Sequence, residues 1–214
     1  MTEETTGPLP KPLKRLLPTR ERQLAALAAL LVLIALGVLF AVVGGRRKEA
    51  YAARALEQAR ATAEAGNLPL ASSQFQRLIQ GYGDTDAGQE AVLALNQIRM
   101  INGQSELAVV GLREFLADDP DPEFAAPANG LLAAALENAG KPAEAAQAYV
   151  QASETANLPY LKAEYLVEAA RAYEAAGQRD QAVGILRRVV KEFEKTPVLT
   201  EAQVRLAELT GGRM

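Results

Sequence analysis

The longest apolar stretch of the sequence lies near its beginning. Residues 24–43 read LAALAALLVLIALGVLFAVV, twenty positions without a charged or polar side chain. At about 1.5 Å of rise per residue, a helix of this length spans roughly 30 Å, the thickness of the hydrocarbon core of a bilayer. No polar face interrupts it, as one would in a helix that packs on a soluble core. The pattern predicts a transmembrane helix over residues 24–45.

Basic residues flank this stretch on both sides and bear on its orientation. Within about 15 residues of the stretch, five precede it and four follow it, a small excess that places the N-terminus in the cytoplasm. The alternative is a cleaved signal peptide, which has a shorter apolar region and a small-x-small cleavage site. Residues 1–23, with four prolines, are predicted to be a disordered tail. The basic residues are Lys11, Lys14, Arg15, Arg20 and Arg22 before the stretch, and Arg46, Arg47, Lys48 and Arg54 after it.

Beyond residue 50 the pattern repeats with a period of 37 residues. Each repeat has a glycine, then an alanine, a large apolar residue and a further apolar residue at fixed spacings. The glycine suits the end of a first helix, where a left-handed backbone needs no Cβ. The alanine suits the point where a second helix crosses the first, and the apolar residues continue its buried stripe. In repeat order the four positions are Gly66, Gly103, Gly140 and Gly177; Ala71, Ala108, Ala145 and Ala182; Phe75, Leu112, Tyr149 and Leu186; and Leu78, Phe115, Ala152 and Val189.

A helix-length segment precedes each glycine, so each repeat predicts a pair of helices. One pair cannot bury its apolar face alone, and neighbouring pairs must therefore stack. The predicted fold class is all-α: an N-terminal transmembrane helix, then an α-solenoid of about four helix pairs over residues 50–210 with a C-terminal capping helix. Thr200 and Gln203 make a capping box for that last helix. The expected repeats cover 52–85, 89–122, 126–159 and 163–196, and the capping helix covers 198–209.

The composition argues against catalysis. The chain has no histidine, cysteine or tryptophan, which removes the commonest general base, the thiol nucleophile and the usual zinc ligands. Gly44 and Gly45 precede Arg-Arg-Lys rather than the spacing of a phosphate-binding loop. Residues 118–121, Asp-Asp-Pro-Asp, lack the rest of a calcium loop and favour a solvated turn with a helix N-cap. We expect no catalytic residue, no cofactor and no metal.

Charge is distributed unevenly along the chain. Residues 1–48 hold eight basic and three acidic residues, a net charge of +5, so the overall charge of -3 leaves -8 for the remainder. An acidic domain repels phosphate backbones. The sequence therefore argues against nucleic acid as a partner.

The repeat resembles the tetratricopeptide repeat, whose consensus has a small residue at position 8, an aromatic at 11, glycine at 15, alanine at 20 and an aromatic at 24. Residues 163–196 fit best, with Ala170, Tyr173, Gly177, Ala182 and Leu186 at those positions. The chain departs from the family in lacking tryptophan at position 4 and in its period of 37 rather than 34 residues. The superhelical twist is therefore left open.

This resemblance implies protein binding on a concave face lined by the first helix of each repeat. Such a mixed groove, with an adaptable methionine, suits an extended or helical segment of a partner. Relatives that clamp a C-terminal carboxylate carry lysine and asparagine there, and this chain does not, which disfavours free acidic C-termini. The alternative is that these positions simply face solvent. The expected groove residues are Leu56, Arg60, Leu93, Gln97, Met100, Glu137, Val167, Arg171 and Glu174.

The basic tail, single span and repeat domain together resemble the YfgM-type ancillary subunits of the bacterial Sec translocon. The segments QGYGDTDAGQEAVLAL and KEFEKTPVLTEAQVRLAEL carry that resemblance, over about residues 20–210. It implies a single-pass protein of the bacterial inner membrane, with a cytoplasmic N-terminus and periplasmic repeats. Its expected partners are translocon subunits or membrane-anchored chaperones. The alternative is a scaffold, including a homo-oligomer, for cell division or outer-membrane assembly.

The predicted membrane helix also carries a candidate packing surface. Gly37, Ala41 and Gly45 are spaced four residues apart, and small residues at this spacing let two helix backbones approach closely in lipid. Alanine-rich spans also produce such spacings by chance. Helix packing and simple anchoring are therefore both open.

Overall fold

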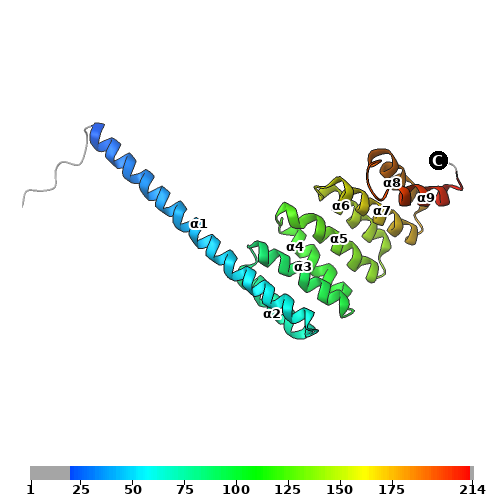
Figure 1. The fold of residues 1–214 in the computed structure, drawn as a ribbon, viewed down its shortest axis with the longest axis horizontal. Helices are drawn as coiled ribbons and strands as arrows, with labels where there is room; N and C mark the ends of the chain where they lie inside the picture. The colour runs from blue at the N-terminus through cyan, green and yellow to red at the C-terminus, as the bar shows by residue number, and fades with distance from the viewer. Residues whose placement is uncertain (1–19, 213–214) are drawn as a thin grey trace, which may run out of the picture. The chain divides into compact units, whose positions relative to one another are not determined.

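The computed structural model describes residues 20–212, and within that range it contains nine α-helices and no strand (Figure 1). This confirms the all-α fold class. The chain divides into two compact units between Arg47 and Lys48, and α1 runs through the division. The helices are α1 (Arg20–Glu64), α2 (Leu68–Tyr82), α3 (Asp86–Ile101), α4 (Ser105–Ala117), α5 (Pro122–Asn138), α6 (Pro142–Thr155), α7 (Pro159–Ala175), α8 (Arg179–Glu192) and α9 (Leu199–Thr210).

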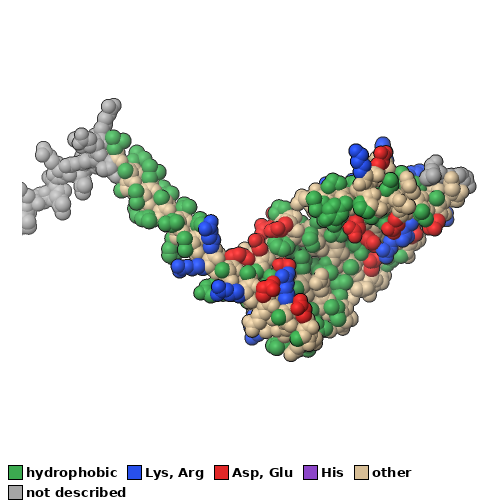
Figure 2. Space-filling model, in the orientation of Figure 1, with side chains coloured by type: hydrophobic (Ala, Val, Ile, Leu, Met, Phe, Trp, Pro, Cys, Tyr) green, Lys and Arg blue, Asp and Glu red, His purple; other side chains and the backbone are tan. Residues whose placement is uncertain are grey.

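The first unit contains the apolar part of α1. Its described apolar side chains from Leu27 to Val43 are exposed, with Phe40 reaching 84% (Figure 2). Among the described residues, α1 is the one helix long and apolar enough to cross a membrane, judged by length and composition alone. Of the predicted tail at residues 1–23, residues 1–19 lie outside the described part of the chain, and residues 20–23 form the first turn of α1.

The second unit is a solenoid of helix pairs. From Lys48 onward α1 pairs with α2, and the pairs α3–α4, α5–α6 and α7–α8 follow, each packed on the next, with α9 at the end. We call α1, α3, α5 and α7 the A helices and their partners the B helices. Helices α3, α5 and α7 begin three or four residues before the expected repeat starts. The cause is local: the side chain of Thr85 caps α3, and prolines fit the first turns of α5 and α7.

The four periodic glycines end the A helices as predicted. Each has a positive φ, between 72° and 81°, a conformation that a side chain would strain. In the second repeat Gly103 donates its N–H to the carbonyl of Met100 at 3.0 Å, and Gln104 donates to Arg99 at 2.8 Å. The same two bonds recur at the other three glycines. This pair of bonds satisfies the last carbonyls of each A helix and turns the chain back into the B helix.

The periodic alanines lie where the paired helices cross. Ala71, Ala108, Ala145 and Ala182 are all fully buried. The large apolar residues that follow them are also buried, and the most exposed of these, Tyr149, reaches only 7%. Two hydrophobic clusters result, one within α1–α3 and one running from α4 to α9. The periodic alanines and the large apolar residues four positions later are therefore part of the core, whereas Phe115, at the last periodic position of its repeat, is only partly buried.

A polar contact fixes the start of the solenoid. Lys48 forms an ion pair with Asp84 in the turn after α2. The carboxylate of Glu49 accepts hydrogen bonds from the backbone N–H groups of Asp86 and Ala87, both at 3.2 Å. These N–H groups belong to the first turn of α3, where an acidic group is favoured. The beginning of the second unit on α1 thus holds the N-terminus of the next A helix.

The predicted capping box on the last helix is wrong. Helix α9 begins at Leu199, so Thr200 already lies inside it, and the N-cap is Val198 without a side-chain hydrogen bond. The turn before α9 closes on itself instead of providing a side-chain cap. The Thr196 hydroxyl donates to the carbonyl of Phe193 at 2.7 Å, and Leu199 N–H donates to the carbonyl of Thr196 at 3.2 Å.

Ala182→Leu should lower the free energy of unfolding by about 1–3 kcal/mol, because a larger side chain overpacks the crossing of α7 and α8. The matched control is Gln181→Leu, at the exposed neighbouring position, which should change it by less than about 0.5 kcal/mol. Chemical denaturation of a fragment starting at residue 46 measures both. Equal losses would contradict the packing described here.

Candidate protein-binding site

Seven of the nine predicted groove residues reach the surface, and two do not. Leu56 and Val167 are only 4% and 2% exposed. Each lies three residues before a fully buried alanine of its A helix, Ala59 or Ala170, and so falls on the stripe that faces the core. Leu56 and Val167 therefore support the A-helix surface from beneath and are not available to a partner.

A cavity of about 470 Å³ opens between α1 and α3, and residues of α2 also line it. It brings together three of the predicted residues, Arg60, Leu93 and Gln97. Arg60 forms ion pairs with Glu57 on its own helix, at 3.0 Å, and with Glu90 on α3. The remaining lining is largely apolar and includes Leu68, Phe75 and Ile101, of which Ile101 is 71% exposed.

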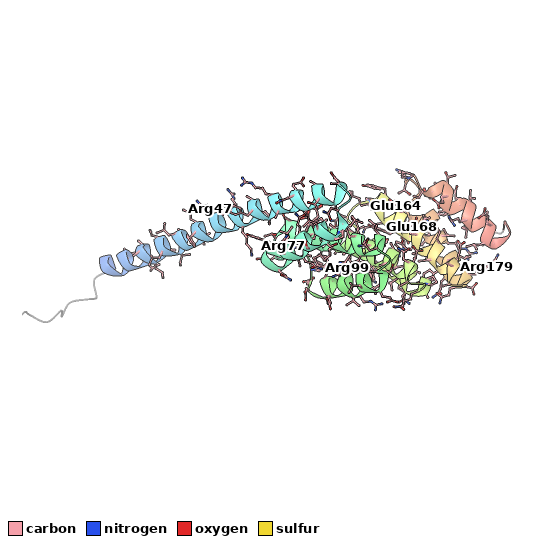
Figure 3. The ribbon with its side chains drawn as sticks, turned by 90° about the horizontal axis from the view of Figure 1, so that it is seen from below. Arg47, Arg77, Arg99, Glu164, Glu168 and Arg179 are labelled. Carbon is pink, nitrogen blue, oxygen red and sulfur yellow. The ribbon has the colours of Figure 1, made fainter. Side chains whose placement is uncertain are left out.

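Charged side chains also gather on the A helices at the other end of the solenoid. Glu137 on α5 accepts a hydrogen bond from the Tyr149 hydroxyl at 3.0 Å, and Arg171 on α7 pairs with Glu168 at 2.7 Å. Burial raises the pKa of Tyr149, and the negative charge of Glu137 raises it further. Burial also raises the pKa of Glu168, an effect that the positive charge of Arg171 opposes. Figure 3 labels Glu168 on α7.

The charged residues at the two ends of the solenoid follow the same 37-residue period. Glu57, Arg60 and Glu90 lie three 37-residue periods before Glu168, Arg171 and Glu201. Arg60 pairs with both of its glutamates, whereas Glu201 pairs with Arg205 on α9. At the intermediate repeats the position of Arg60 is taken by Gln97 and then by Ala134. The arginine–glutamate pairs of the A-helix surface thus lie at its two ends.

Glu174 differs from its counterpart one repeat earlier. Its Oε1 atom is buried and has no hydrogen-bond partner among the described residues. Glu137, one period before it, uses the hydroxyl of Tyr149, but the residue one period after Tyr149 is Leu186. The missing hydroxyl accounts for the unpaired oxygen.

Sequence reasoning missed several residues of this surface. Ile101, Glu90 and Glu168 were not among the expected groove residues, although the Glu-x-x-Arg pair at Glu57 and Arg60, which recurs three 37-residue periods later, indicated Glu168. Met100 is half-buried and packs against the core, away from the cavity that holds Gln97. Asp118 ends α4 and Asp121 precedes α5, so the acidic run is a turn between repeats.

The candidate packing residues of the apolar segment keep their status as a prediction. Gly37 and Gly45 are helical, and a Cβ added at either would meet nothing within 4 Å. The side chain of Ala41 lies outside the described part of the structure.

Comparison with known proteins matches one segment of the repeat domain to a family. Residues 164–196 match the tetratricopeptide repeat family. The match covers one repeat, 33 of the 214 residues. The matched segment is nearly the one that fits the consensus best, residues 163–196. No curated protein matches the chain.

Solved structures agree with this assignment at the level of the fold. Kinesin light chain TPR-like repeats from Podosopora anserina are similar at 22% identity, with a TM-score of 0.57, over 75% of this chain and 87% of that chain. MamA is similar at 17% identity and a TM-score of 0.57, over 76% of this chain and 84% of its own. BtubC (BKLC) from P. vanneervenii is similar at 17% identity and a TM-score of 0.56, over 78% and 85%. Identities this low show a tetratricopeptide-like solenoid and nothing about partners.

Tyr149→Phe should lower the free energy of unfolding by about 1 kcal/mol, because it removes the hydrogen bond to Glu137 while keeping the aromatic ring. Tyr173→Phe is the matched control, since Tyr173 is equally buried in the same cluster and its hydroxyl makes no hydrogen bond within the described residues. Thermal and urea denaturation compare the two variants. A larger loss for Tyr173→Phe would contradict the role given to the hydroxyl.

Proposed function

We propose that this chain is a membrane-anchored adaptor that binds a segment of another protein on its A-helix surface. The single observation that carries the proposal is the cavity between α1 and α3, where Arg60, Leu93 and Gln97 meet beside the exposed Ile101. Tetratricopeptide repeats generally mediate interactions between proteins, which the family match supports. The exposed apolar part of α1 supports the anchor.

The surface indicates the character of the bound segment. Apolar side chains of the partner fit the lining around Leu93 and Ile101, and charged residues fit the paired ends at Arg60 and Arg171. Ion pairs at the rim of an interface select the partner and its orientation more than they add affinity. An extended or helical segment with an apolar centre and charged ends meets these requirements. No acid–base pair or nucleophile is brought together here, so we propose no enzymatic activity.

The cellular setting follows from the resemblance to YfgM-type subunits. We place the apolar segment in the bacterial inner membrane, the N-terminus in the cytoplasm and the repeats in the periplasm. The partners are then translocon subunits or membrane-anchored chaperones. The second candidate is a scaffold of cell division or outer-membrane assembly, and the same Gly37, Ala41 and Gly45 spacing supports self-association in it. Identification of the proteins that co-purify in mild detergent separates the two.

A reporter enzyme that is active only in the cytoplasm should be silent when fused after Met214, because the small excess of basic residues lies before the span. The same reporter fused before Met1 should be active. A cytoplasmic signal from the C-terminal fusion would overturn the topology.

Gln97→Trp should reduce recovery of bound partner proteins about tenfold or more, because the ring fills the cavity between α1 and α3 and a loss of about 1.4 kcal/mol in binding is a factor of ten. Gln97 is exposed, so the fold should tolerate the change. The matched control is Gln181→Trp on α8, which is also exposed and lines none of the cavities described. Quantitative mass spectrometry after detergent co-purification gives the measurement. Undiminished recovery with Gln97→Trp would remove the A-helix surface as the binding site.

A further inference from the structure

The second repeat breaks the 37-residue pattern at three positions that lie together. Asn96 lies on α3 at the position where the other A helices have a buried alanine, and it is 1% exposed. Arg99 lies one turn later, and Gly111 faces both residues from α4. A Cβ on Gly111 would come within 2.6 Å of Arg99 Nη1 and 2.9 Å of Asn96 Oδ1. In the other three repeats the position of Asn96 is taken by Ala59, Ala133 and Ala170. The position of Arg99 is taken by Thr62, Leu136 and Tyr173, and that of Gly111 by Gln74, Ala148 and Ile185.

These three residues line a second cavity, of about 650 Å³, between α2, α3 and α4. Its apolar walls come from side chains of all three helices, and acidic side chains lie at the end nearest the turns between repeats. The α3 residues that line it fall on a different stripe from Glu90, Leu93 and Gln97, so it opens on another side of α3 from the A-helix cavity. Figure 3 labels Arg99 on α3 and Arg77 on α2. Besides Asn96, Arg99 and Gly111, the walls include Ile79, Val92 and Phe115, and the acidic end includes Glu114, Asp118 and Asp119.

The groove between α2 and α4 lacks the ion pairs that bridge the next two B helices. Between α4 and α6, Arg113 pairs with Glu144 at 2.6 Å, and Lys141 pairs with Glu106 at 2.8 Å. One period earlier these pairs become Gln76 with Leu107, and Gln104 with Pro69, none of which is charged. Leu107 is instead 48% exposed, and its neighbour Val110 is 50% exposed.

The guanidinium of Arg99 is only partly used by the protein. Its Nη1 donates to Asn96 Oδ1 at 3.0 Å and, at the limit of hydrogen-bond distance, to the carbonyl of Leu107 at 3.5 Å. Nε and Nη2 donate to no acceptor in the described part of the chain, and Arg99 forms no ion pair there. Burial lowers the pKa of Arg99, and the nearby charge of Glu114 opposes this effect. Nε and Nη2 form the edge of a guanidinium that binds a carboxylate through two parallel hydrogen bonds.

We propose that the groove between α2 and α4 binds an apolar segment of a partner protein that places an acidic side chain on Arg99. Charge complementarity selects this occupant: the free edge of Arg99 takes the carboxylate, and the walls at Ile79 and Phe115 take the apolar side chains. The acidic end near Asp118 favours a basic residue at the other end of the segment. This site is separate from the A-helix surface and does not depend on it.

The test uses the full-length chain in detergent with defined peptides. The probes are fluorescent octapeptides with blocked ends that begin with lysine, continue with leucine, valine or phenylalanine interrupted by serine, and close with glutamate. Each has a counterpart that closes with glutamine. The wild type should bind glutamate members about tenfold more tightly, because a carboxylate accepts two charge-assisted hydrogen bonds from Arg99 and a neutral amide cannot. Failure of every glutamate member to bind, or equal affinity for both sets, would overturn the proposal.

Variants assign the effect to the guanidinium. Arg99→Gln should abolish the preference for glutamate, and Arg99→Lys should keep only part of it, because an ammonium lacks the planar fork. Arg77→Gln on α2 is the matched control and should retain the full preference, since Arg77 is exposed and lies outside the cavity. A preference that survives Arg99→Gln would contradict the assignment.

A further variant keeps the test valid if Arg99→Gln fails to fold. Glu114→Gln changes an exposed side chain and should strengthen binding of the glutamate members at least twofold, because it removes a competing carboxylate. Weaker binding in this variant would count against the proposal. Gln97→Trp should leave octapeptide binding unchanged, and Arg99→Gln should leave recovery of A-helix partners unchanged. Either proposed binding site can therefore be disproved without disproving the other.

Discussion

The close crossing of paired helices at alanine is the constraint on which the solenoid depends. A methyl group lets two backbones approach until their ridges interlock, and the four crossing alanines have no exposed surface. Because this contact fixes the separation within each pair, the large residues one turn later reach the same depth in every repeat. The left-handed glycines then determine where each B helix starts. Packing and chain reversal together position every surface residue.

This regular frame makes departures from it informative. Asn96 in the core is hydrogen-bonded to the partly buried Arg99, where other repeats have mostly apolar residues, and buried polar groups are costly unless they are paired. Gly111 supplies the space they need. The A-helix surface varies differently: its arginine–glutamate pairs keep the period at the two ends and lose it in the middle. The A-helix surface thus differs between repeats in its exposed residues, whereas the groove between α2 and α4 differs from the other repeats in a core residue, Asn96.

The sequence predicted the fold well because glycine and alanine have few substitutes at a left-handed cap and a close crossing. It predicted the surface less well. Leu56 and Val167 were assigned to the groove by repeat position, but the core needs their side chains. The capping box expected at Thr200 is absent, because α9 follows a turn that closes through Thr196, which no periodic pattern records. Asn96 and Arg99 depart from the 37-residue pattern in the sequence itself. The cavity beside them could not be predicted, because it depends on where α2 and α4 lie relative to α3.

The continuity of α1 has a consequence for release of the repeats by proteolysis. The same helix supplies both the apolar segment and the first A helix, and Lys48 and Glu49 already contact the turn before α3. A cut after Glu49 would remove from the solenoid the ion pair with Asp84 and the carboxylate that accepts hydrogen bonds from the N-terminus of α3. Only cleavage between Val43 and Lys48 would separate the apolar segment from an intact first repeat. Shedding of a functional domain is therefore confined to a window of a few residues around the glycines and arginines that follow the apolar run.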